Sequence, residues 1–225
     1  TLPRLKAICS NIESIEQLVV VPVIQDAVAI DGFGNAVLFH DFLSAHRGAA
    51  LFCEQLPFNH PLYIMYSSGT TGAPKCIVHS AGGTLIQHLK EHQLHVDLKP
   101  SDRLFYFTTC GWMMWNWLVS GLASGATLVL YDGSPFYPDA KALIDLVEAE
   151  QVSIFGTSAK YLSALEKAGV NPNKTHNLSQ LRTLLSTGSP LSQESFRYVY
   201  RDIKADLCLA SISGGTDIIA CFVLG

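Results

Sequence analysis

Residues 66–75, with the sequence YSSGTTGAPK, combine the residue types that bind phosphate groups. The segment holds four serine and threonine hydroxyls, two glycines and one lysine between two apolar runs. Hydroxyl and backbone N–H groups donate hydrogen bonds to phosphate oxygens, glycine lets the backbone approach closely, and lysine supplies positive charge. The spacing differs from the G-x-x-x-x-G-K-[ST] pattern of a Walker loop. Composition alone leaves two interpretations open, a phosphate-binding loop and a flexible turn.

The segment resembles, almost letter for letter, the [ST]SGTTGxPK signature of the adenylate-forming enzymes. This family includes acyl-CoA synthetases, luciferases and the adenylation domains of peptide synthetases. Three further segments follow in the family's order, namely residues 111–114 (GWMM), 186–190 (STGSP) and 213–217 (SGGTD). The segments YSSGTTGAPKCIVH, CGWMMWNW and SISGGTD are most similar to the acyl-CoA synthetases that act on acetoacetate. The resemblance covers essentially the whole chain and implies an ATP-dependent acid–thiol ligase.

The resemblance also implies the reaction and the residues that carry it. Acetoacetate would join AMP with release of pyrophosphate, and the acyl group would then pass to coenzyme A, with ATP and Mg²⁺ required. The implied phosphate-binding residues are Ser67, Ser68, Gly69, Thr70, Thr71, Gly72 and Lys75. The other implied nucleotide-binding residues are Gly188, Ser189 and Pro190 beside the adenine, and Ser213, Gly214, Gly215 and Thr216. Lys75, Thr216 and Asp217 are implied as catalytic residues, with Thr216 bonding the α-phosphate and Asp217 facing Mg²⁺.

Two positions depart from the family's pattern. Asp217 stands where the family usually has glutamate, so its carboxylate is one methylene shorter, and a water or a closer strand would fill the gap to Mg²⁺. Ser189 stands where the family has an acidic residue, so one hydrogen-bond acceptor is lost beside the adenine. Neither change abolishes nucleotide binding by itself.

The implied acyl pocket is formed by Trp112, Met113, Met114 and Gly214. Acetate-selective relatives carry a tryptophan at the position of Gly214, so we expect the glycine to leave that volume open. The two methionines are flexible and adapt to a longer acyl chain. A four-carbon keto acid therefore fits this pocket better than acetate. Another short- or medium-chain acid remains an alternative substrate.

Short β-branched runs alternate with segments of helical period along most of the chain. The expected strands cover residues 15–24, 62–66, 77–79, 104–109, 126–131, 152–155, 181–186 and 206–212. The expected helices cover residues 39–43, 82–94, 115–122, 139–150, 158–169 and 192–201. Such alternation predicts an α/β fold with largely parallel sheets covered by helices.

Composition limits the class of protein. The 225 residues carry 15 Lys and Arg against 19 Asp and Glu, a net charge of −4, and 48% are hydrophobic. This balance is typical of a folded chain with a large core and argues against a nucleic-acid-binding protein. The uncharged residues 105–131 are interpreted as a buried helix and strand rather than a membrane span, because polar side chains and glycines interrupt them.

The cysteines and histidines give weaker indications. The six cysteines include no C-x-x-C pair, so we expect buried thiols in a reducing compartment and a cytosolic protein. His88, His92 and His95 share the spacing of one helix face, which suits either a metal site or, as favoured here, a solvated surface.

We expect residues 1–225 to form an incomplete AMP-binding domain. By the same resemblance, the C-terminal lobe, the ribose-binding aspartate and the adenylation lysine would lie beyond Gly225. We therefore expect these residues to be inactive by themselves. A truncated chain without catalytic activity is the alternative.

Overall fold

The structure, a computed structural model, describes residues 2–24, 28–44, 46–67 and 72–225, and the chain divides into two compact units, residues 1–55 and 56–225. The first unit contains helices α1 (Leu2–Asn11) and α2 (Phe39–Ser44) and the parallel strands β1 (Leu18–Val20) and β2 (Ala36–Leu38). The strand expected over residues 15–24 is thus much shorter than predicted. Pro22, which has no N–H for a strand ladder, lies just beyond its end.

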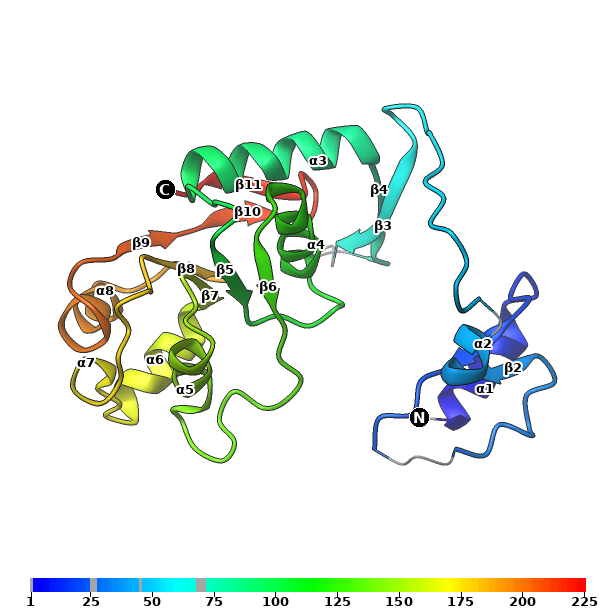
Figure 1. Cartoon of the computed structure of the whole chain (residues 1–225), viewed down its shortest axis with the longest axis horizontal. Helices are drawn as coiled ribbons and strands as arrows, with labels where there is room; N and C mark the ends of the chain where they lie inside the picture. Colours follow the sequence, from blue (N-terminus) through cyan, green and yellow to red (C-terminus); the bar gives the residue numbers. More distant parts are fainter. Residues whose placement is uncertain (1, 25–27, 45, 68–71) are drawn as a thin grey trace. The chain divides into compact units, whose positions relative to one another are not determined.

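A five-stranded parallel sheet forms the centre of the second unit (Figure 1). Its strands are β5 (Arg103–Tyr106), β6 (Thr127–Val129), β7 (Ile154–Ser158), β8 (Thr183–Thr187) and β9 (Cys208–Ser211). They lie in the order β6-β5-β7-β8-β9, and every neighbouring pair is parallel. The predicted α/β fold with a largely parallel sheet covered by helices is confirmed.

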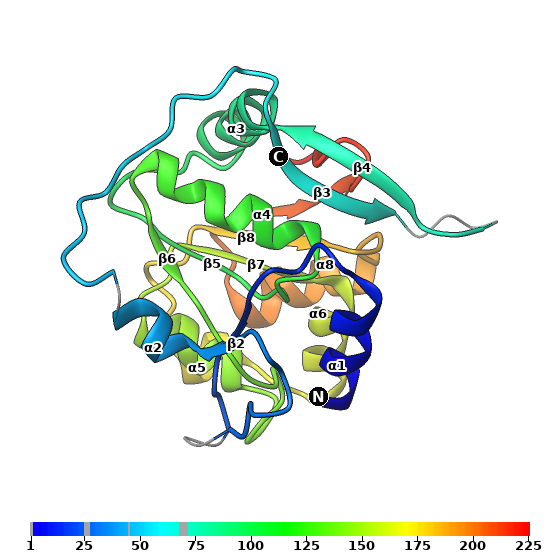
Figure 2. The same ribbon diagram turned by 90° about the vertical axis from the view of Figure 1, so that its right-hand side faces the viewer.

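Helices cover both faces of this sheet, as Figures 1 and 2 show. Helices α5 (Ala142–Ala149), α6 (Ala159–Lys167) and α8 (Gln193–Tyr198) pack on one face, and α4 (Met113–Ser120) packs on the other. Alternate side chains of β5 enter the two cores, with Phe105 on the first face and Leu104 and Tyr106 on the second. The uncharged residues 105–131 are therefore a buried helix and strands. No helix among the described residues is long and apolar enough to cross a membrane.

Two antiparallel hairpins complete the second unit. Strand β3 (Pro61–Ser67) pairs with β4 (Lys75–Ser80), and β10 (Ser213–Gly215) pairs with β11 (Ala220–Val223). Helix α3 (Ala81–Lys90) follows β4 and continues directly as a π-helix over Glu91–His95. The remaining elements are a 3₁₀-helix (Gly121–Ser124), α7 (Pro172–Thr175) and a second π-helix (Val199–Ile203).

The solvated surface predicted for the three histidines is wrong for two of them. His88 and His92 are fully buried, because α3 packs against α4, and only His95 is exposed. His88 Nε2 donates to the carbonyl oxygen of Ile219 at 2.6 Å, and its Nδ1 lies 2.8 Å from the hydroxyl of Ser120. Burial lowers the pKa of the His88 imidazole, which favours the neutral ring. Within the described ranges no group of three or more His, Cys, Asp or Glu side chains suits a metal ion.

The prediction that the cysteines are buried is also wrong. Cys53, Cys76, Cys110 and Cys208 are exposed, and the other two are half-buried. Cys76 lies on an exposed face of β4, and Cys208 is the first residue of β9 at the edge of the sheet. All six are free thiols. The thiols therefore contribute little to the core.

Lowering the pH is expected to destabilise the second unit through His92. Burial, reinforced by the neighbouring His88, lowers the pKa of the His92 imidazole to about 3. The unfolded chain binds this proton near the ordinary pKa of about 6.5, so the free energy of unfolding is highest above that pH and falls as the pH drops towards 3. At pH 5 the expected loss is about 2 kcal/mol, since one pKa unit corresponds to about 1.4 kcal/mol.

Urea titrations near pH 7 and pH 5 measure this loss. His92→Leu should remove the part of the pH dependence that His92 causes. His60→Gln, at an exposed position, is the matched control and should leave the pH dependence unchanged. A His92→Leu protein that loses as much stability between the two pH values as the wild type would contradict the prediction.

Candidate functional site

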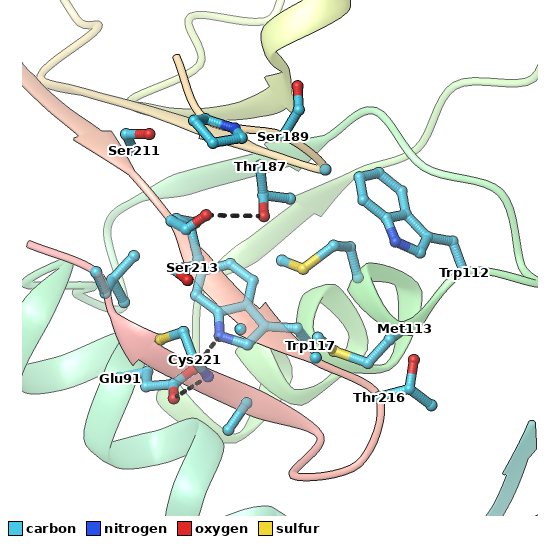
Figure 3. A pocket seen from close by; sticks show the side chains of 18 residues that line it. Glu91, Trp112, Met113, Trp117, Thr187, Ser189, Ser211, Ser213, Thr216 and Cys221 are labelled. Atoms are coloured by element: carbon cyan, nitrogen blue, oxygen red, sulfur yellow. Dashed lines mark hydrogen bonds between the residues drawn. The ribbon is translucent and has the colours of Figure 1, made fainter. Parts of the chain in front are cut away.

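A cavity of about 340 Å³ lies at the carboxyl ends of the parallel strands (Figure 3). The chain passes from β5 to β6 on one side and then to β7 on the other side of β5, so the direction of winding reverses between β5 and β7. In open α/β sheets ligands bind outside the carboxyl ends of the strands at such a reversal. The segments that follow β5, β8 and β9 supply most of the cavity lining. Its position outside the carboxyl ends of β5, β8 and β9 makes this cavity the candidate site.

The cavity brings together three of the four segments singled out in the sequence. Its predicted lining residues are Trp112, Met113, Met114, Gly188, Ser189, Pro190, Ser213, Gly214, Gly215 and Thr216. Its other lining residues are Glu91, Trp117, Thr187, Ser211, Ile212, Ala220, Cys221 and Leu224. Of these, Trp117, Thr187, Ser211 and Ile212 lie within the segments CGWMMWNW, STGSP and SISGGTD that the sequence analysis quoted. Glu91, Ala220, Cys221 and Leu224 carry no local pattern that marks them as a site.

The wall contributed by α4 begins at the GW pair. Trp112 has an extended backbone (φ −107°, ψ 143°) and immediately precedes the first residue of the helix. Met113 and Trp117 lie four residues apart on one helix face, and both are buried against the second core and line the cavity. Helix α4 thus presents the flexible thioether of Met113 and the rigid indole of Trp117 to the cavity.

The wall contributed by β8 turns sharply at Gly188. Its φ of +88° lies in the left-handed region, which favours glycine. Just before it, the hydroxyl of Thr187 donates to the carbonyl oxygen of Ile212 at 3.2 Å and ties the ends of β8 and β9 together. Ser189 and Pro190 follow the turn and are exposed at the rim. The Thr187 bond and the left-handed backbone of Gly188 therefore both help to hold this segment in place.

The expectation that Gly214 leaves open volume needs correction. A Cβ atom at this position would lie 2.2 Å from the carbonyl oxygen of Ala220 and 2.7 Å from Cα of Cys221. Gly214 pairs with Cys221 in the hairpin, beside a register irregularity between Ser213 and Gly214. The glycine is thus required by the close approach of β11, and its missing side chain does not enlarge the cavity.

The turn between β10 and β11 is held by two histidines from distant parts of the chain. His79 Nε2, on β4, donates to the carbonyl oxygen of Thr216 at 2.8 Å, while His88 on α3 bonds Ile219 at the other end of the turn. Ile219 has a φ of +49°, a strained value for a β-branched residue. Thr216 lines the cavity, whereas Asp217 is exposed and does not line it.

The glycine-rich segment connects β3 to β4. Ser67 and Lys75 are directly opposite each other at the end of this hairpin, and Gly72 is exposed. Ser68, Gly69, Thr70 and Thr71 lie outside the described residues. Lys75 and His79 are four residues apart on β4, so their side chains leave the same face of the strand. Because His79 contacts Thr216, that face is the one directed at the turn after β10. Ser67, Gly72 and Lys75 do not line the cavity itself.

Asp217 fits a magnesium ion shared with a nucleotide. Mg²⁺ in phosphate-transfer sites is commonly held by one or two carboxylates, substrate phosphates and several waters. An exposed carboxylate beside Thr216 meets that requirement, and a closed cage of protein ligands is not needed.

Comparisons with known proteins agree with this arrangement. The family described as AMP-binding enzyme matches residues 10–214. The acetoacetyl-coenzyme A synthetase of Rhizobium meliloti is 61% identical over 208 residues, which is 92% of this chain and 32% of that protein. A malonamoyl-CoA synthetase of Penicillium aethiopicum is 54% identical over 181 residues, which is 74% of this chain and 25% of that protein.

A solved structure of a similar protein has the same fold as this chain. The acetoacetyl-CoA synthetase from Streptomyces lividans matches with a TM-score of 0.88 and 40% identity, over 100% of this chain and 34% of that chain. The present chain therefore spans about a third or less of the length of these relatives. The family match includes the glycine-rich hairpin and the segments that line the cavity from α4 and β8, so the chain belongs to the AMP-binding enzyme family.

Proposed function

We propose that the protein containing this chain activates acetoacetate with ATP and transfers the acyl group to coenzyme A. One observation carries the proposal: residues 112–114, 188–190 and 213–216, which are far apart in sequence, line one cavity at the carboxyl ends of the parallel strands. The likeness to two acetoacetyl-CoA synthetases and the family membership support the same reaction.

The chemistry has two steps. A carboxylate oxygen of the acid attacks the α-phosphorus of ATP, the bond to the bridging oxygen breaks, and pyrophosphate leaves. The sulfur of coenzyme A then attacks the acyl carbon, its proton is lost, and AMP leaves. Both steps depend on holding charged groups in line and on stabilising the charge that develops. The chain's task is therefore orientation and electrostatic stabilisation.

The nucleotide would lie between the glycine-rich hairpin and the cavity rim. We assign the β- and γ-phosphates to Ser67, Ser68, Gly69, Thr70, Thr71, Gly72 and Lys75, and the adenine to Gly188, Ser189 and Pro190. Thr216 would bond the α-phosphate at the cavity edge, because its carbonyl is already fixed by His79. Mg²⁺, held by Asp217 and phosphate oxygens, would neutralise charge on the leaving pyrophosphate.

The acid would occupy the inner part of the cavity, against α4. Met113, Met114 and Trp117 give this part an apolar surface that suits the short carbon chain of a small acid. The side chains on α4, rather than open volume at Gly214, therefore support the assignment of a four-carbon acid. The free thiols are consistent with a cytosolic location, which we propose for the protein.

A comparison of acids tests the proposal. Pyrophosphate exchange by the full-length protein is expected to be fastest with acetoacetate, and slower with acetate, butyrate and 3-hydroxybutyrate. Faster exchange with acetate than with acetoacetate would contradict the assigned substrate, while the reaction class would stand. No exchange with any acid would indicate a chain without catalytic activity.

Malonamate belongs in the same comparison. It differs from acetoacetate by an amide nitrogen in place of the terminal methyl group, and one relative is a malonamoyl-CoA synthetase. The apolar surfaces of Met113 and Met114 favour a methyl over an amide, because an amide without a hydrogen-bond partner is costly to bury. We therefore expect malonamate to react more slowly than acetoacetate.

A further inference from the structure

A buried carboxylate lies beside the cavity. Glu91 is 1% exposed and is among the cavity-lining residues. Its Oε2 accepts a hydrogen bond from Trp117 Nε1 at 2.9 Å, and its Oε1 accepts one from Gln87 Nε2 at 2.9 Å and one from the backbone N–H of Cys221 at 3.1 Å. A buried carboxylate without such donors would be strongly destabilising. The three donors, together with the Lys90 ammonium 3.7 Å from Oε1, therefore fix both oxygens.

These bonds join two walls of the cavity. Trp117 belongs to α4 and Cys221 belongs to β11, and each bonds a different oxygen of Glu91, as the dashed lines in Figure 3 show. The carboxylate therefore sets the position of the indole relative to β11. Burial, with Glu91 close by, raises the pKa of the Cys221 thiol to about 12, so this thiol stays protonated and adds no second negative charge to the cavity.

The indole of Trp117 has little freedom apart from the bond to Glu91. Its ring meets the ring of His92 edge-on, with centroids 4.2 Å apart, and that of Tyr106 with centroids 5.9 Å apart. Such contacts hold the ring by packing, whereas the N–H group selects which edge of the ring faces Glu91. Loss of the carboxylate would leave a buried N–H unpaired and remove that selection.

The local helix geometry supports a specific role for Glu91. The backbone N–H of Val96 bonds the carbonyl oxygen of Glu91 at 3.1 Å, which is the five-residue spacing of a π-helix. Short π-helical turns are rare and occur frequently at functional sites. Here the π-helix begins at Glu91, and both Glu91 and His92 are buried next to Trp117.

We propose that Glu91 is a positioning residue that sets acyl selectivity by fixing Trp117 as a rigid wall of the acyl pocket. The inference rests on the proposed function, because it concerns the part of the cavity assigned to the acid. Glu91 does not touch the reacting atoms. It acts through the indole, whose position decides how well an acid of given length and shape fills the space beside Met113.

Glu91→Gln tests the proposal in the full-length protein. An amide has one acceptor oxygen, so either Trp117 Nε1–H or the Cys221 N–H loses its partner. We expect the ratio of kcat/KM for acetoacetate to that for butyrate to fall about tenfold, with KM for ATP unchanged within twofold. Trp117→Phe removes the N–H from the other side and keeps an aromatic ring. It should lower the same ratio, and the double variant should be no worse than the more impaired single variant.

Asp102→Asn is the matched control. Asp102 is also a buried carboxylate, it accepts from Arg182 and from the backbone N–H of Lys99, and it does not line the cavity. We expect this variant to lower the thermal midpoint of unfolding without changing the selectivity ratio. General destabilisation and loss of selectivity are thereby separated.

The outcomes are distinguishable. A folded Glu91→Gln protein with an unchanged ratio, or an Asp102→Asn protein with an equal fall in the ratio, would overturn the proposal. Should Glu91→Gln fail to fold, the ratio measured for Trp117→Phe decides. A wild type that prefers another acid overturns the assigned substrate alone, and the ratio is then taken between that acid and its nearest homologue.

Discussion

Lys75→Ala in the full-length protein is expected to slow formation of the acyl adenylate at least a hundredfold. The ammonium group leaves β4 on the face directed at Thr216, where the charge of a triphosphate would lie. Each hydrogen bond to a charged group contributes about 1.5–3 kcal/mol, and every 1.4 kcal/mol is a factor of ten in rate. Loss of one strong ionic contact, or of two weaker ones, accounts for an effect of this size.

Pyrophosphate exchange at saturating acetoacetate measures the effect. Lys167→Ala removes another exposed lysine, from the last position of α6, and should leave the exchange rate unchanged. Lys75→Arg keeps the charge and should retain part of the activity. An unchanged rate for Lys75→Ala would remove this lysine from the mechanism and weaken the case for the hairpin as a phosphate site.

Gly214→Ala is expected to destabilise the fold by about 3 kcal/mol, the upper part of the usual range for inserting volume into a packed region. The added Cβ would meet the backbone of β11 at Ala220 and Cys221, and a backbone atom cannot move aside as the end of a flexible side chain can. β11 would have to shift, and with it the N–H that bonds Glu91. A fall in acyl-adenylate formation should accompany the loss of stability.

Gly215→Ala is the neighbouring control for this prediction. A Cβ atom at Gly215 meets nothing within 4 Å, although Gly215 also lines the cavity. Urea unfolding of the two variants should therefore differ by most of the predicted 3 kcal/mol. Equal stabilities would show that β11 can move without cost. The same contact means that a tryptophan at position 214 cannot simply fill the pocket as the sequence suggested.

Most elements of the second unit were predictable because their signals are local. β-branched runs and helical periodicity placed β5 to β9, α4, α5, α6 and α8 to within a few residues, whereas the four-residue α7 was not predicted. In the first unit the same signals predicted α2, but they made β1 too long and missed α1 and β2. α1 has no buried residue, so no apolar stripe marked it, and β1 and β2 are only three residues long.

The candidate site was predictable only where its residues form short motifs. Trp112, Gly188 and Thr216 lie in such motifs, and the structure brings them to one cavity. Glu91 was missed because its partners come from residues 117 and 221, and a glutamate on a helix usually faces solvent. Gly214 was misread because the sequence does not distinguish a glycine that leaves space from one demanded by a close strand.

The bond from His79 to Thr216 makes the number of residues in β4 matter as much as their kind. Side chains alternate along a strand, so an odd insertion or deletion between Lys75 and His79 would reverse the side from which one of them emerges. Strand β4 could still pair with β3, yet either the ammonium group of Lys75 or the imidazole of His79 would face away from the turn. Within this stretch, a substitution or an even-numbered length change would therefore keep both side chains on the side of the turn, and an odd-numbered change would separate them.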